Sequence, residues 1–268
     1  MYYFRVTIAY KGTQYIGWQA QSQNTLHEKR PTIEGTILNV LKKIVNYQPC
    51  TISAASRTDA GVHAQGQLAK ITLPKDIDSA RLLMGLNTML PSDIRILTCT
   101  TSTKEYQPTK TNISKEYHYY FTTSPVNNVA TSDIALHVPL GDNQSDTLAL
   151  LHKACLLFIG QHDFYNFCSR DTSVKTSIRQ IFYCDICQLP SSPLTTKMYY
   201  LKIRGNGFLK HMVRYIMGTL LDLAKGRITL VDIALFLEHH QDKKLSPKAK
   251  SLGLHLWHIE ESEAKVTP

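Results

Sequence analysis

The sequence of 268 residues lacks any apolar run long enough to cross a bilayer. Its longest apolar candidate, residues 212–224, is interrupted by Arg214 and Asp222. The N-terminus also lacks the basic leader and apolar core of a secretory signal. We therefore expect a soluble protein that has no membrane partner and resides in the cytoplasm.

A complete set of metal ligands is also missing. The six cysteines include one pair with C-x-x-C spacing, Cys184 and Cys187, within a predicted strand. Residues three apart on a strand point to opposite faces of a sheet, so this pair is poorly arranged to share a metal ion. No second such pair and no histidine pair completes a zinc site. We expect reduced cysteines and no bound metal.

Acidic residues are scarce relative to basic ones. The chain has 21 Asp and Glu against 30 Lys and Arg, which gives a net charge of +9. Hydrophobic residues make up 43% and charged residues 19%, as in a globular protein. The positive balance favours a polyanionic partner, with nucleic acid first and an acidic membrane surface second.

Two halves of the chain show the same order of predicted elements. In the first half, we predict strands near residues 4–10, 51–55, 65–73 and 94–98, and helices near 33–44 and 79–86. In the second half, we predict strands near residues 117–121, 178–189, 198–204 and 254–259, and helices near 146–159, 208–225 and 229–238.

Each half therefore follows the order β-α-β-β-α-β, with one extra helix in the second. This order is that of the split β-α-β unit of ferredoxin-like folds. We predict an α+β fold of two similar halves, residues 1–105 and 106–268, with helices on one side of the sheets. Joined edge to edge, the halves would leave a basic cleft between them.

The densest polar cluster of the chain is the segment from Ser56 to Ala64. Arg57, Thr58 and Asp59 are consecutive and lie on a predicted loop between two strands, where functional groups are often placed. The plain alternative is a surface turn in which Asp59 caps a backbone amide and Arg57 is solvated. A metal site of Asp59 and His63 would have too few ligands on one loop.

The strand over residues 115–121 carries aromatic side chains on both faces. Aromatic rings beside basic residues suit the stacking of unpaired bases. Tyrosine and phenylalanine are also ordinary strand residues, so packing is the plain alternative for them.

The predicted helix that begins at Phe208 places Lys210 and Arg214 four residues apart, on one face. Arg214 lies in an apolar stripe, where a cation needs a carboxylate or phosphate partner unless its head reaches water. Four lysines after the last predicted helix form either a solvated basic face or a set of phosphate contacts: Lys243, Lys244, Lys248 and Lys250.

Together these motifs resemble the tRNA pseudouridine synthase A family. The segment Arg57-Thr58-Asp59-Ala60-Gly61-Val62-His63-Ala64, followed by Gly66-Gln67, is similar to the signature of that family. Further similar segments follow in the order of the family, from Gly17-Trp18-Gln19 through Gly160-Gln161-His162-Asp163-Phe164 to Phe208-Leu209, His211-Met212-Val213-Arg214 and Gly218.

The resemblance implies a duplicated α+β fold with a central, mostly antiparallel sheet, in a homodimer that needs no cofactor. It also implies the isomerisation of uridine to pseudouridine at positions 38 to 40 of the anticodon arm of tRNA. Asp59 matches the catalytic aspartate, which attacks the uracil ring or the ribose or removes a ribose proton. Tyr117 matches the tyrosine that packs on the target base, and Arg214 the residue that keeps the aspartate ionised. Arg57 resembles the arginine that helps the base leave the stack.

One segment departs from the family. Tyr106-Gln107-Pro108-Thr109 stands where the family usually has a phenylalanine-histidine-x-arginine segment, so an RNA contact from that arginine is in doubt. Two other functions stay open. A metal-dependent nuclease would use Asp59, His63 and Asp163, and a tRNA-binding chaperone would carry a relic of the active site.

Overall fold

The computed structural model describes residues 1–19, 30–140, 144–170, 174–192, 197–241 and 243–262. Its contacts divide the chain into two compact units. Unit 1 combines residues 1–113 with 256–268, and unit 2 is formed by residues 114–255.

Unit 1 follows the order β-α-β-β-α-β and is completed by the last strand of the chain. Its elements are β1 (Tyr2–Tyr10), η1 (Gly12–Gln14), α1 (Ile33–Ile44), β2 (Thr51–Ala54), β3 (His63–Leu73), α2 (Ser79–Met89), β4 (Ile94–Ser102), α3 (Pro108–Thr111) and most of β10 (Leu254–Glu261).

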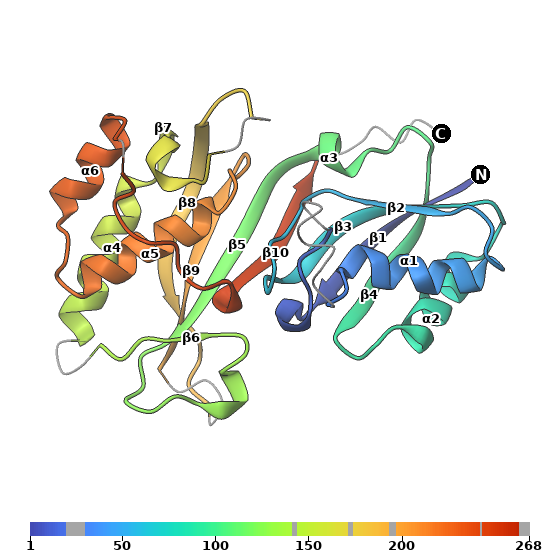
Figure 1. Ribbon diagram of the computed structural model, residues 1–268, viewed down its shortest axis with the longest axis horizontal. Coiled ribbons are helices and arrows are strands. Elements are labelled where there is room, and N and C mark those ends of the chain that lie inside the picture. The colour runs from blue at the N-terminus through green and yellow to red at the C-terminus, as the bar shows by residue number, and fades with distance from the viewer. Residues whose placement is uncertain (20–29, 141–143, 171–173, 193–196, 242, 263–268) are drawn as a thin grey trace. The chain divides into compact units, whose positions relative to one another are not determined.

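The central strand of unit 1 is β1, which pairs antiparallel with β3 on one side and with β4 on the other. The far edge of β3 carries β2 and β10. Alternate residues of β1 are buried, and Figure 1 shows α1 and α2 beside this sheet. Helix α1 begins where the Thr32 hydroxyl accepts a 2.9 Å hydrogen bond from the amide of Gly35.

Unit 2 contains the remaining helices and strands. Its elements are β5 (Asn112–Thr122), η3 (Val129–Thr131), β6 (Leu136–His137), α4 (Gln144–Leu157), β7 (Gly160–Asp163), η4 (Tyr165–Phe167), β8 (Ile178–Gln188), β9 (Met198–Gly205), α5 (Met212–Ala224), α6 (Leu230–Glu238) and η5 (Ser251–Gly253).

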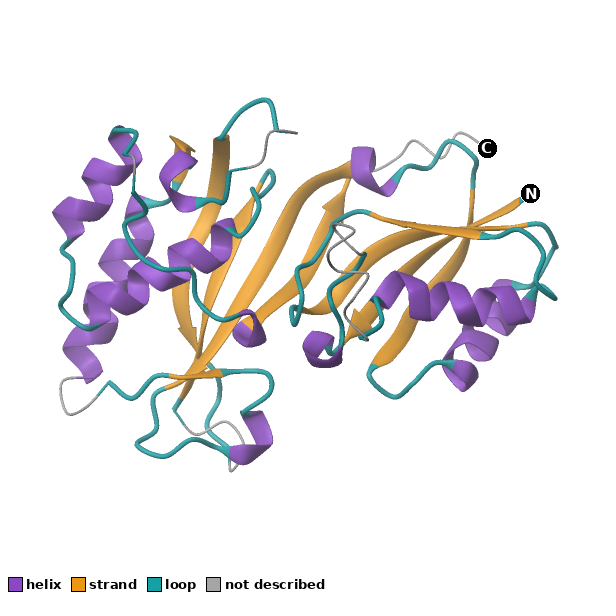
Figure 2. Cartoon of the chain, viewed as in Figure 1, coloured by secondary structure: helices purple, strands orange, loops and turns teal. Residues whose placement is uncertain are grey.

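The strands of unit 2 lie in the order β5-β9-β8-β7 and pair antiparallel, while the short β6 pairs parallel with β5. Tyr119, Leu201 and Ile203 are fully buried on one face of this sheet. Figure 2 shows α4, α5 and α6 gathered beside the sheet. The predicted α+β fold with a mostly antiparallel sheet is thus confirmed.

Two details of unit 2 differ from the prediction. The strand β7 was not predicted, because four residues are too few to show an alternation. Helix α5 begins at Met212 rather than at Phe208, because His211 has a φ of 63° and so cannot continue a helix backwards. Lys210 therefore lies outside the helix, and its predicted place on a helical face with Arg214 is wrong.

The cysteine pair lies as the strand period predicts. Cys184 is opposite Ile203 and buried, whereas Cys187 is opposite Tyr200 on the other face and half-buried. All six cysteines are free thiols. No helix in the described part of the chain is long and apolar enough to cross a membrane.

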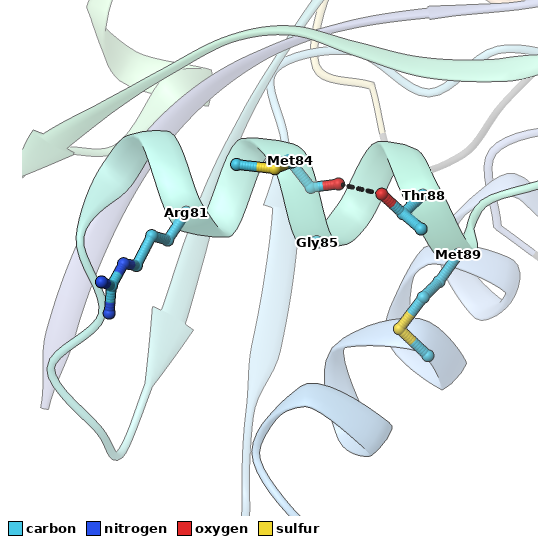
Figure 3. Close-up of a pocket in the computed structure, with 5 residues that line it drawn as sticks. All are labelled: Arg81, Met84, Gly85, Thr88 and Met89. Atoms are coloured by element: carbon cyan, nitrogen blue, oxygen red, sulfur yellow. Dashed lines mark hydrogen bonds between the residues drawn. The ribbon is translucent and has the colours of Figure 1, made fainter.

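A glycine allows the segment after α6 to lie directly on α5. A Cβ atom at Gly218 would stand 1.9 Å from the carbonyl oxygen of Pro247, which is backbone and cannot rotate away. Gly85, in the middle of α2, is the opposite case. It lines an open pocket of about 390 Å³ with Arg81, Met84, Thr88 and Met89 (Figure 3), and a Cβ there would meet only a methyl group of Ile44 at 3.8 Å.

The same substitution should therefore have opposite effects in these two helices. We expect Gly218→Ala to lower the free energy of unfolding by about 2 kcal/mol or more, as overpacked cores do. Gly85→Ala should raise it by about 0.5–1 kcal/mol, because alanine restricts the unfolded chain and favours the helix. Urea unfolding followed by circular dichroism measures both values. Equal effects of the two variants would show that the close approach at Gly218 is not real.

Candidate active site

The loop over residues 55–62 is held to the sheet of unit 1 by a buried glutamine. The Gln67 side chain is fully buried and forms two hydrogen bonds with the backbone of Ser56. It donates to the Ser56 carbonyl oxygen at 2.6 Å and accepts from the Ser56 amide at 3.2 Å. Gln67 lies on β3, so the sheet itself fixes where the loop begins. Because both backbone groups of Ser56 are satisfied by one side chain, the loop needs no pairing strand here.

Consecutive side chains of the loop alternate between the interior and solvent. Thr58 is 3% exposed and its hydroxyl shares a 2.7 Å hydrogen bond with the Tyr10 hydroxyl at the end of β1. Arg57 is exposed, and Asp59 is half-buried. The buried Thr58 therefore anchors the loop between the exposed Arg57 and the half-buried Asp59. The exposure of Arg57 agrees with the plain alternative of a surface turn, and the anchoring of Thr58 adds that the backbone of this turn is held to the sheet.

A second segment, residues 12–18, packs against the same loop. The Thr58 carbonyl oxygen accepts a 3.1 Å hydrogen bond from the Trp18 amide, and the Tyr15 carbonyl oxygen accepts one of 3.2 Å from Gly61. Gly17 has a φ of 110°, and a Cβ there would lie 2.6 Å from the Thr58 carbonyl oxygen. Glycine is thus required at this position both for its backbone conformation and for the close approach.

His63 has a structural task at the end of the loop. It is 2% exposed, and its Nδ1 atom accepts a 3.2 Å hydrogen bond from the Gly12 amide. This nitrogen therefore carries no proton and is already in use. Within the described ranges, no group of three His, Cys, Asp or Glu residues is arranged to hold a metal ion.

Arg57 lies close to an acidic residue that the sequence analysis did not single out. Burial raises the pKa of Glu34, and the positive charge of Arg57 opposes this shift. Glu34 is in the first turn of α1, and its amide donates to the Trp18 carbonyl oxygen at 2.9 Å. Arg57, Glu34 and the 12–18 segment therefore lie together at one end of the loop. No pattern in the sequence pointed to Glu34.

Tyr117 lies on β5 in unit 2 and is 7% exposed. Its ring meets the ring of Phe208 edge to face, with centroids 5.1 Å apart and planes at 81°. Tyr119 and Tyr120 on the same strand are buried as well. For these two tyrosines the packing alternative is the one that the structure favours. Tyr117 lies in the middle of β5, opposite Ile203 of β9, and is as buried as Tyr120.

Arg214 is half-buried in the first turn of α5. Its Nε atom donates a 2.8 Å hydrogen bond to the carbonyl oxygen of Ala249, whose amide donates to the Arg214 carbonyl oxygen at 2.9 Å. Burial raises the pKa of Tyr119, and the Arg214 charge nearby opposes this shift. The hydrogen bond to this backbone carbonyl thus orients the Arg214 guanidinium, which does not simply extend into solvent.

The segment around Tyr106, which differs from the usual family sequence, has a structural role in unit 1. The Tyr106 hydroxyl donates to Glu261 Oε1 at 2.7 Å, and Arg5 donates to the other oxygen of this carboxylate at 2.6 Å. Pro108 occupies the start of α3. The segment therefore anchors the last strand of the chain through Glu261, a contact that no pattern in the sequence revealed.

The four predicted site residues fall two by two into the units. Arg57 and Asp59 share one anchored loop in unit 1, and Tyr117 and Arg214 lie in unit 2, where Arg214 is close to the neighbouring Tyr119. The sequence analysis missed the groups that hold the loop, above all the hydroxyl of Tyr10. Gln67 entered the sequence analysis only as part of a motif. Its place on a strand beside the polar loop was the signal that its amide side chain could hold the backbone of that loop.

Comparison with known proteins gives a consistent result. Residues 154–260 match the profile of a family described as tRNA pseudouridine synthase. The tRNA pseudouridine synthase A 2 of Desulfotalea psychrophila is 65% identical over 260 residues, which cover 97% of this chain and 99% of that protein. The tRNA pseudouridine synthase A of Listeria innocua is 31% identical, over 96% of this chain and 98% of its own length. The tRNA pseudouridine synthase A 2 of Protochlamydia amoebophila is 32% identical, over 94% and 91%.

These matches extend over nearly the whole chain, so the matched part of the chain spans residues 59 and 214. The chain belongs to the tRNA pseudouridine synthase A family.

Proposed function

We propose that this protein is an isomerase that converts uridine to pseudouridine in the anticodon stem-loop of tRNA, at positions 38 to 40, with Asp59 as its catalytic carboxylate. Relatives named as tRNA pseudouridine synthases match over nearly the full length of the chain. The observation that carries the proposal for Asp59 is the anchored loop, in which Gln67 and Thr58 hold the backbone that leads into the reactive position.

The chemistry needs only groups that the chain itself can supply. The bond from uracil N1 to ribose C1′ breaks, the ring turns, and a bond from C5 to C1′ forms. The proton on C5 is lost and N1 gains one, so the product is an isomer with no net oxidation or transfer. A carboxylate that attacks the ring or the ribose, or that removes a ribose proton, suffices for this sequence, and we propose no cofactor and no metal.

We assign the other residues as the family resemblance implies. Tyr117 packs on the target uracil, Arg57 helps the base to leave the stack, and Arg214 keeps Asp59 ionised. Removing a base from its stack costs a few kcal/mol, which contacts to the base and backbone offset. We further propose that the enzyme acts as a cytoplasmic homodimer on tRNA and has no membrane partner.

The first prediction concerns the carboxylate. Asp59→Asn should release no tritium from tRNA that carries 5-tritiated uridine, while the wild type releases it without added cofactor and in the presence of a chelator. The amide keeps the size of the side chain and removes its charge, so tRNA should still bind. Asp76→Asn, at an exposed aspartate of the same unit, is the control and should be fully active. Near wild-type release by Asp59→Asn refutes the assignment.

Two further measurements, activity with a chelator and tRNA binding, distinguish the isomerase from the nuclease and the chaperone. Cleavage of the tRNA on a gel that stops with the chelator, without release of tritium from C5, would indicate a nuclease. Binding without release by the wild type in a single-turnover assay would indicate a chaperone with a relic site.

The second prediction concerns Arg214. Arg214→Ala should turn over at least about 100-fold more slowly, because the Asp59 carboxylate loses its counter-charge. Residues that act as a unit are not additive, so adding Arg214→Ala to Asp59→Asn should cost little further activity. Single-turnover rates measure both effects, with melting temperatures as a check on folding. Unchanged turnover of Arg214→Ala would show that the pairing is wrong.

The third prediction tests the anchoring of the loop. Gly17→Ala should lower kcat by about 10- to 100-fold, since a displacement of the loop by about 1 Å misplaces the carboxylate. Gly160→Ala is a matched control, because Gly160 has the same φ of 110° but meets only the side chain of His162, at 3.4 Å. Both variants should lose stability through backbone strain, and only the first should lose kcat. Equal kcat values would contradict the role of Gly17.

A further inference from the structure

Three separate segments of unit 2 bring cations onto two tyrosine rings. Tyr165 belongs to η4, Tyr215 to α5, and Lys244 to the segment after α6. Arg170 and His240 complete this group, which we call the Tyr165 cluster.

Lys244 is the centre of the cluster. Its ammonium donates a 2.8 Å hydrogen bond to the Tyr165 carbonyl oxygen and lies 5.5 Å from the centroid of the Tyr165 ring. The same nitrogen lies 5.6 Å from the centroid of the Tyr215 ring. A lysine held by a carbonyl and two rings has lost most of the mobility that an exposed lysine keeps.

The Tyr165 ring is itself fixed by a second aromatic ring and a carboxylate. The His240 ring stacks on it with centroids 4.4 Å apart and planes at 19°. His240 Nε2 lies 2.8 Å from Asp163 Oδ2, and the other oxygen of Asp163 accepts the Tyr165 amide at 3.0 Å. The carboxylate of Asp163 therefore contacts both His240 and the backbone of Tyr165, and it links these two residues of the cluster.

Arg170 brings a second cation to the same ring. Its guanidinium carbon is 5.6 Å from the Tyr165 centroid. The preceding residue, Ser169, fixes the backbone, since its amide donates to the Lys210 carbonyl oxygen at 2.9 Å and its hydroxyl shares a 2.7 Å hydrogen bond with His211 Nδ1. Arg170 is thus tied to the turn that opens α5.

The two cations are close enough to repel each other. Burial lowers the pKa of Lys244, and the charge of Arg170 lowers it further, against the opposing influence of Cys168. Over the described ranges, no carboxylate forms an ion pair with Lys244 or Arg170. Rings attract cations by about 0.5–1 kcal/mol but leave the net charge in place. The rings attract the two cations without neutralising them, so the cluster attracts anions.

We propose that the Tyr165 cluster is a binding site for a phosphodiester group of the tRNA backbone, with Lys244 and Arg170 as the phosphate ligands. This inference rests on the proposed function, because tRNA supplies the anion. Lys244 and Arg170 are positioning residues that hold the substrate and take no part in the chemical step. The site differs from the exposed lysines nearby, since Lys248 and Lys250 lie over no aromatic ring in the described part of the chain.

The experiment compares how strongly salt weakens tRNA binding to single-charge variants of the full-length enzyme. A lost phosphate contact reduces the slope of log Kd against log salt by about 0.9. Lys244→Gln and Arg170→Gln should each show this reduction between about 50 and 200 mM salt, with a several-fold higher Kd and KM. At saturating tRNA, kcat in the tritium assay should stay within about twofold of the wild type, because the chemistry lies elsewhere.

Lys248→Gln is the matched control, because it removes the same charge from the same segment without touching the cluster. Its slope should equal that of the wild type, and Lys244→Arg should restore the slope that Lys244→Gln loses. Arg170→Gln guards against a purely structural effect, since Arg170 donates no hydrogen bond within the described chain. A slope change of equal size in Lys248→Gln would overturn the proposal by showing a general effect of charge.

Inorganic phosphate distinguishes the source of the anion. If millimolar phosphate raises the melting temperature of the wild type but not of Lys244→Gln, while the tRNA slopes of the two are equal, the cluster takes free phosphate and the proposal is overturned. The two proposals fail separately. An inactive wild type whose slope still depends on Lys244 contradicts the isomerase function, whereas an active one with an unchanged slope contradicts the cluster.

Discussion

The two hydrogen bonds between Gln67 and Ser56 are the interaction on which the account of unit 1 depends. A loop that carries a catalytic group must be rigid without the pairing that makes a strand rigid. Here one buried amide replaces a neighbouring strand, and the hydroxyl pair of Thr58 and Tyr10 adds a second anchor further along the loop. Asp59 follows Thr58 directly, so these two anchors hold the backbone that leads into it. Such preorganisation is how a fixed scaffold contributes to catalysis.

In unit 2, the corresponding constraint is the close packing of one segment on α5. The absence of a side chain at Gly218 lets the segment after α6 lie against α5, where Ala249 exchanges two hydrogen bonds with Arg214. The same segment carries Lys244 onto the ring of Tyr215. The segment after α6 thus orients Arg214, which we propose as the partner of Asp59, and it also contributes Lys244 to the proposed phosphate site. A displacement of the whole segment would therefore affect both Arg214 and the cluster, whereas the loss of the Lys244 charge alone affects only the cluster.

Much of this could be predicted from the sequence because the strongest signals are local. The alternation of β1 and the cap and apolar stripe of α1 depend on neighbours in the sequence, and both elements appear where they were predicted. The polar loop with Asp59 was recognisable for the same reason. Other features depend on contacts between distant segments. The start of α5 was misplaced because one residue, His211, adopts a left-handed backbone that apolar periodicity does not show. Lys244 and Lys248 are alike in sequence, and only the fold brings tyrosine rings to the first of them.

The central claim is that the anchored loop fixes the position of one carboxylate, and Asp59→Glu tests it most directly. Glutamate keeps the charge and moves the carboxylate by one methylene. The account predicts that the single-turnover rate of pseudouridine formation falls by about 100-fold or more, while the affinity for tRNA stays the same. A rate close to that of the wild type would contradict the account, because it would show that the placement of this carboxylate does not limit the reaction.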